Sequence, residues 1–146
     1  METIQFIHSY WAYLVLLVLV LATFNALIKF FGNKEFEARD FRLSLFTLIT
    51  MHIQLLIGIV LFFTKDYFGT IEEVGGMGEV MKNAVLRSNI IEHPITMILA
   101  VVFVTVGYSK HKKKLVSKPK FKMLAIFYTL ALILVLAKIP WNTWFN

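Results

Sequence analysis

The sequence predicts an all-α integral membrane protein, a four-helix up-and-down bundle that forms a single domain over residues 1–146. Hydrophobic residues make up 58% of the chain and aromatic residues 15%. The apolar residues are gathered into four long blocks. Each block approaches or exceeds the roughly 18 residues that separate a membrane-spanning helix from a buried helix of a soluble protein.

The four helices are predicted at about 6–31, 43–63, 90–108 and 121–139. The first contains no charged residue before Lys29, and a helix of this length can cross a hydrocarbon core of roughly 30 Å. A cleaved signal peptide would be shorter and preceded by basic residues. Because Glu2 precedes this block, we expect the first helix to be retained.

Basic residues predict the orientation, because short cytoplasmic loops retain lysine and arginine preferentially. The first connection carries Lys29, Lys34, Arg39 and Arg42, and the third carries seven lysines between Lys110 and Lys122. Both connections are therefore predicted to be cytoplasmic, which puts both termini on the outer, periplasmic side. The expected location is the bacterial cytoplasmic (inner) membrane, with the chain crossing the lipid bilayer four times.

The remaining connection, residues 64–89, is the longest. Between residues 77 and 87 its apolar residues recur at helical intervals, which is typical of an amphipathic helix that lies on the membrane interface.

Composition also excludes several functions. The net charge of +6 arises mainly from one inter-helix segment without interleaved aromatic residues. We interpret this charge as a topology signal that also contacts anionic lipid, and we exclude nucleic acid as a partner. The chain has no cysteine, which excludes disulfides, cysteine-ligated clusters and covalent haem attachment. Without a nucleophile–base, HExxH or phosphate-loop motif, an electron carrier or subunit is favoured over a stand-alone enzyme.

The four histidines are the candidate functional residues. His111 lies within the lysine run and is predicted to be a solvated loop residue. His8, His52 and His93 fall in the first three helices. Ionisable residues inside spanning helices are costly and often functional, although a neutral histidine also bonds a neighbouring helix.

Helix geometry indicates which histidines meet. Counted from the cytoplasmic helix ends, His52 lies roughly 15 Å up, His93 roughly 25 Å and His8 roughly 30 Å. The first and third helices of an up-and-down bundle are diagonal neighbours, so His8 and His93 are expected to face each other. Two opposed imidazoles suit a b-type haem. His52 remains open as the alternative partner of His93, as the ligand of a second site, or as a hydrogen-bond donor.

The residues around His93 fit this reading. Pro94 is tolerated in a first helical turn, so His93 is predicted near a helix N-terminus. Glu92 is favoured there and would accept a hydrogen bond from an imidazole. Arg87 and Lys82 are candidates to pair with haem propionates, and ordinary capping with snorkelling cations is the alternative for them.

A resemblance to a known family supports the same site. The segments that carry it are "HSYWAYLVLLVLVLATFNALI", "LSLFTLITMHIQLLIGIVLFF", "VLRSNIIEHPITMILAVVFVTVGYSK" and "KMLAIFYTLALILVLAKIPW". They resemble the short four-helix membrane proteins of Bacteroidota commonly labelled cytochrome B. The resemblance covers nearly the whole chain and puts His8, His52 and the Glu92–His93 pair at matching positions. It implies b-type haem and electron transfer in the cytoplasmic membrane.

Three functions therefore remain open. The first is a membrane b-type cytochrome or cytochrome-like subunit, with haem b held by His93, His8 or His52, and with quinol or a periplasmic redox protein as partner. The second is a copper- or zinc-binding membrane accessory protein that uses the same histidines and Glu92. The third is a cofactor-free structural subunit of a larger membrane complex.

Overall fold

The computed structural model describes residues 2–141, and all regular structure in this range is helical. The elements in order are α1 Glu2–Phe31, α2 Ala38–Thr64, α3 Tyr67–Val74, α4 Met77–Lys82, α5 Ala84–Arg87, the π-helical segment η1 Ser88–Glu92, α6 His93–Lys113 and α7 Ser117–Lys138.

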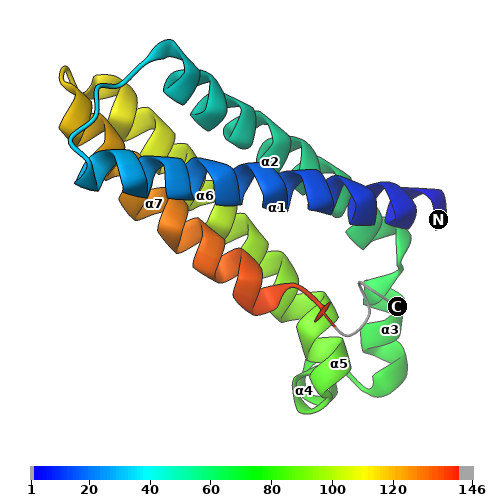
Figure 1. Ribbon diagram of the computed structural model, residues 1–146. Helices are drawn as coiled ribbons and strands as arrows, with labels where there is room; N and C mark the ends of the chain where they lie inside the picture. Colours follow the sequence, from blue (N-terminus) through cyan, green and yellow to red (C-terminus); the bar gives the residue numbers. More distant parts are fainter. Residues whose placement is uncertain (1, 142–146) are drawn as a thin grey trace.

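Four helical stretches are long and apolar enough to cross a membrane, as predicted. They are Thr3–Phe31, Ala38–Thr64, Ala84–Lys113 and Ser117–Lys138. Helix α1 packs on α2 and α7, and α6 packs on α7 and less extensively on α2. Helices α1 and α6 are therefore diagonal across the bundle, as expected for up-and-down topology (Figure 1).

The bundle has two chemically different ends. The "lysine end" carries the connections between α1 and α2 and between α6 and α7. The "histidine end" carries the beginnings of α1 and α6 and the ends of α2 and α7; there, Lys65 donates a hydrogen bond to Gln5 (Nζ–Oε1 2.6 Å). The predicted lysine-rich third loop is mostly helical, because α6 continues to Lys113 and α7 begins at Ser117.

The long connection is also more ordered than predicted. It contains the unpredicted helix α3, and the expected amphipathic helix at 77–87 is divided into α4 and α5 by Asn83, whose side chain caps α5. Helix α5 leads through η1 directly into α6, so the third span begins at Ala84. In Figure 1, α3, α4 and α5 lie beyond one end of the bundle.

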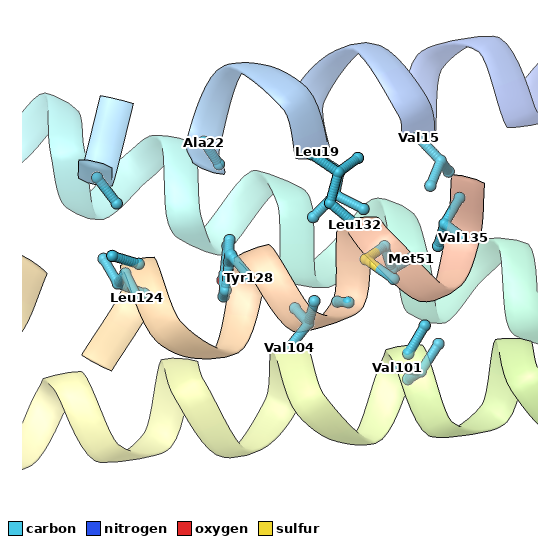
Figure 2. Close-up of a cluster of buried hydrophobic side chains, with 14 of the residues drawn as sticks. Val15, Leu19, Ala22, Met51, Val101, Val104, Leu124, Tyr128, Leu132 and Val135 are labelled. Carbon is cyan, nitrogen blue, oxygen red and sulfur yellow. The ribbon is translucent and has the colours of Figure 1, made fainter. Parts of the chain in front are cut away.

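The core lies toward the lysine end and in the middle of the bundle. Figure 2 shows side chains from all four spanning helices pointing into it, among them Leu19, Met51, Val104 and Tyr128. Helix α2 contributes its polar edge, because its buried residues are Asp40, Ser44, Thr47, Thr50 and Met51. Their hydroxyl groups donate to main-chain carbonyls of α2 itself, as Ser44 does to Phe41 (2.8 Å) and Thr47 to Leu43 (2.8 Å). Across the interface, the Tyr128 hydroxyl of α7 donates to the Ser44 carbonyl (2.8 Å).

The ion pair between Asp40 and Lys29 joins α2 to α1 at the lysine end. The carboxylate of Asp40 accepts hydrogen bonds from Lys29 Nζ (2.7 Å), Asn25 Nδ2 (2.9 Å) and the main-chain N–H of Glu37 (2.8 Å). Because the last of these bonds satisfies a main-chain donor just before the first turn of α2, the helix begins at Ala38, several residues before the apolar run that predicted it.

Candidate functional site

The histidine end of the bundle is less tightly packed than the lysine end. No residue of α2 beyond Met51 is buried, and the same holds for residues 93–99 of α6 and 3–14 of α1. At the opposite end Ala26, His111 and Phe121 are almost fully inaccessible. At the histidine end, α1, α2 and α6 therefore contribute half-buried or exposed side chains, and the buried ones come from Val135 of α7 and Ile90 of η1.

His8 and His93 meet at this end from the diagonal helices α1 and α6. Their ring centroids are 6.3 Å apart, and the ring planes are inclined by 83°. The expectation that these two histidines lie at similar depth and face each other is confirmed. The contact bridges two helices that otherwise touch little.

The orientation of the His93 ring is fixed by α7. Its Nδ1 lies 2.9 Å from the main-chain oxygen of Lys138. Since a carbonyl oxygen can only accept, Nδ1 carries the proton and Nε2 of the neutral ring has a free lone pair. A histidine whose second nitrogen donates to a carbonyl in this way is the usual arrangement for a metal ligand.

A π-helical turn precedes His93. The main-chain N–H of His93 donates to the Ser88 carbonyl, so it is not one of the free amides expected of a helix N-terminus. Pro94 lies in the first turn of α6, as predicted, and the wider turn accommodates a residue that has no N–H. Such turns occur often at functional sites.

His8 is held differently. Its ring lies against α2, where a Cβ atom added to Gly58 would be 3.3 Å from His8 Cε1. Gln54 donates to the His8 carbonyl (2.8 Å), which ties α1 to α2. Among the described residues, His8 Nδ1 and Gln54 Oε1 are both buried atoms without a hydrogen-bond partner. Buried polar atoms are seldom left unsatisfied in native proteins, although Thr23, His111 and Thr129 carry such atoms too. The two at the histidine end differ in belonging to residues that are joined by a hydrogen bond.

Glu92 has a different role from the one expected. Its carboxylate pairs with Arg87 (Nε–Oε2 2.8 Å) and with Lys138 (Nζ–Oε1 3.2 Å) instead of an imidazole. Arg87 also donates to the Met81 carbonyl (2.7 Å). These bonds hold the start of the third span against the end of α7, and so they support His93 indirectly. Lys82 pairs with Glu79 at 3.4 Å and is largely exposed.

The structure does not bring His52 to the other two histidines. Its side chain is exposed on α2, with Nδ1 donating to the Leu48 carbonyl (2.8 Å) and Nε2 3.4 Å from Thr105 Oγ1. The inward edge of α2 is the one that carries Met51, Gln54 and Gly58. This placement follows from burial of the polar edge, which turns His52 toward the outside.

The prediction that His111 is a solvated loop residue is wrong. His111 belongs to α6 and is fully buried, with its ring packed against Phe36 (5.5 Å), Tyr108 (5.0 Å) and Phe41 (6.1 Å). The lysines on either side of His111 predicted that its side chain is exposed to water. However, α6 extends through this lysine run, and His111 occupies the inward face of that last turn.

The donor groups of the histidine end limit which metals or cofactors they could hold. Among residues 2–141, no group of three His, Cys, Asp or Glu side chains is placed to hold a metal ion. The 6.3 Å between the His8 and His93 centroids fits two imidazoles on one iron, for which bonds of about 2 Å give a separation of roughly 6 Å. The spacing of the two rings is therefore compatible with two imidazoles on opposite sides of one iron, and the described residues supply no third protein donor beside them.

Two further residues of this site were not identified from the sequence. Gln54 and Gly58 both lie on the polar edge of α2, and that edge was the available signal. The role of the Lys138 main chain had no signal in the sequence, because a carbonyl group is common to every residue.

The chain matches no known protein-family model, no curated protein and no solved structure at a significant level.

Proposed function

We propose that this multi-pass membrane protein is a b-type cytochrome or a cytochrome-like subunit, in which His8 and His93 are the axial ligands of one haem b. The observation that carries the proposal is the facing pair of imidazoles from diagonal helices. His93 has a free Nε2 lone pair, and His8 has a buried nitrogen without a partner among the described residues.

Each residue of the pair has a defined part in this proposal. The Lys138 carbonyl fixes the tautomer of His93 and makes its Nε2 a stronger donor. Gln54, bonded to the His8 carbonyl, fixes the first turns of α1 against α2. Gly58 leaves room beside the His8 ring. A haem held in this way supplies one-electron transfer at a potential set by its ligands and surroundings.

The packing at the histidine end is consistent with a bound cofactor. Three of the helix segments there, residues 3–14, 52–64 and 93–99, contribute no buried side chain, so separating them displaces little of the apolar core. Glu92 keeps the α6–α7 pair together through Lys138. Of the two basic residues that are candidates to pair with haem propionates, Lys82 is the more available. Arg87 already donates hydrogen bonds to Glu92 and to the Met81 carbonyl.

We also propose that the lysine end faces the cytoplasm and the histidine end the periplasm of a bacterial inner membrane. The support is the excess of lysine and arginine at one end only. The haem would then lie near the outer leaflet, where quinol or a periplasmic redox protein can exchange electrons with it. Contact with the lipid bilayer follows from the exposed apolar surface of all four helices.

The absorption spectrum of the detergent-purified protein, oxidised and then reduced with dithionite, tests the proposal. A Soret band with a reduced α-band of b-type is expected. Replacing His8 or His93 by alanine should abolish the low-spin spectrum, whereas His52→Ala should preserve it. A normal low-spin spectrum in His93→Ala would refute the assignment, and a colourless protein that contains stoichiometric copper or zinc would favour the metal-binding alternative.

The cofactor-free structural subunit has one observation of its own in its favour. The polar groups at the histidine end already join helices to each other: Gln54 joins α2 to α1, and Glu92 and His93 join the third span to α7. A protein that is both colourless and free of metal, and that copurifies with other membrane subunits, would support this alternative.

A further inference from the structure

The lysine end carries a concentration of positive charge that its own acidic residues do not balance. Residues 29–42 and 110–122 hold 11 of the 15 lysines and arginines but only three of the nine acidic residues. Of these three, Asp40 is paired with Lys29 and Glu37 with Arg39. Within residues 2–141, no lysine of the 110–122 run forms an ion pair with a carboxylate.

Part of this run is engaged in internal contacts. Lys118 donates to Asn33 Oδ1 (2.8 Å) and lies over the Phe30 ring (5.2 Å). Lys120 donates to the His111 carbonyl (3.2 Å) and lies over the Phe36 ring. Lys118 therefore joins the start of α7 to the end of α1, and Lys120 joins α7 to the end of α6; neither is available to a ligand without breaking those bonds.

Another part of the run surrounds a hollow. Tyr108, Ser109, Lys112 and Lys113, all from the last turns of α6, line a surface hollow of about 410 Å³. The Lys112 ammonium lies 5.6 Å from the centre of the Tyr108 ring. The Tyr108 ring packs against the ring of Phe41 from α2, with 5.9 Å between the two ring centroids. The Tyr108 side of the hollow is thus fixed by packing, whereas the ammonium groups of Lys112 and Lys113 lie at the ends of flexible side chains.

The residues that line the hollow carry groups that bind phosphate. Two have ammonium groups, two have hydroxyl groups, and none has a carboxylate. Charge-assisted bonds from cations to phosphate oxygens are among the stronger polar contacts in proteins. The hollow lies in the last turns of a candidate membrane span, Ala84–Lys113, and tyrosine and lysine are typical of the place where such a helix leaves the hydrocarbon core.

We propose that this hollow binds the phosphate of an anionic phospholipid headgroup. Lys112 and Lys113 contact the phosphate, Ser109 and Tyr108 donate hydroxyl hydrogen bonds, and the acyl chains lie along the apolar outer surface of α6, where Val102 and Leu99 are exposed. This proposal is independent of haem binding. A defined binding site for one lipid differs from the diffuse electrostatic attraction that any basic loop exerts on an anionic membrane.

Native mass spectrometry of the detergent-purified full chain, titrated with phosphatidylglycerol or phosphatidylcholine, tests the proposal. The variant K112Q/K113Q is compared with K114Q/K122Q, which removes the same charge from exposed lysines outside the hollow. Each lysine at the phosphate is expected to contribute about fivefold in affinity, so K112Q/K113Q should lose roughly 25-fold for phosphatidylglycerol. The control double variant should lose less than about threefold.

Three results would overturn the proposal. Equal losses in the two double variants would show diffuse electrostatic attraction. Equal binding of phosphatidylglycerol and phosphatidylcholine would show that negative charge is not recognised. Displacement of the lipid by millimolar inorganic phosphate would assign the site to the free anion. The variant S109A, which keeps both charges, should weaken phosphatidylglycerol binding by a smaller factor, and helical circular dichroism checks that all variants are folded.

Discussion

The ion pair between Lys29 and Asp40 provides a quantitative test of how the lysine end is held together. We consider the substitution Lys29→Met, which keeps a long unbranched side chain and removes the ammonium group. Asp40 is then left with only Asn25 and the Glu37 main chain as hydrogen-bond donors. Its side chain is 2% exposed, so water cannot readily replace the lost partner.

The magnitude follows from the burial of the two partners. A hydrogen bond to a charged group contributes about 1.5–3 kcal/mol, and breaking a fully buried pair costs about 3–5 kcal/mol. Lys29 is 22% exposed, which lowers the expected cost toward the first range. We therefore expect Lys29→Met to reduce the free energy of unfolding by about 2 kcal/mol.

The assay is unfolding in mixed micelles, followed by circular dichroism and tryptophan fluorescence. Arg39→Gln is the matched control, because its pair with Glu37 is 3.4 Å long and largely exposed at both partners; a loss below about 0.5 kcal/mol is expected there. The double variant Lys29→Met/Asp40→Asn should recover at least half of the loss, since the unpaired charge is gone. Equal effects of Lys29→Met and Arg39→Gln would refute the reasoning.

Three further predictions concern packing and the unassigned histidine. Gly107→Ala places a Cβ atom 2.5 Å from Phe127 Cβ across the α6–α7 contact, and overpacking of this kind should destabilise the protein by about 1–3 kcal/mol in the same unfolding assay; an unchanged stability would show that the two helices separate freely. Tyr128→Phe removes a buried hydrogen bond to the Ser44 carbonyl, which should cost about 1–2 kcal/mol; a stabilised variant would contradict this role of the hydroxyl. His52→Ala changes an exposed side chain and should alter stability by less than about 0.5 kcal/mol; a loss above 1 kcal/mol would show that the Thr105 contact matters more than its 3.4 Å distance implies.

Several features of this protein could be predicted from the sequence alone. Long apolar runs have few alternatives to spanning helices, because only a helix satisfies its own main-chain groups in lipid. The number and order of the spans then follow, and up-and-down topology makes α1 and α6 diagonal neighbours. That relation was enough to predict that His8 and His93 face each other, since both lie near the N-terminal ends of two helices that run in the same direction.

The tertiary structure decided how each helix is rotated, and this could not be read from hydrophobic periodicity. In a soluble protein the apolar face turns inward, but in lipid both faces of a helix can be apolar. The polar edge of α2 turns inward because it bonds neighbouring helices there: Gln54 donates to the His8 carbonyl of α1, and the Ser44 carbonyl accepts from Tyr128 of α7. That single rotation moves Gln54 and Gly58 toward His8 and turns His52 outward. In the same way, packing against Phe36 and Tyr108 decided that His111 is buried, although the lysines on either side of it lie in water.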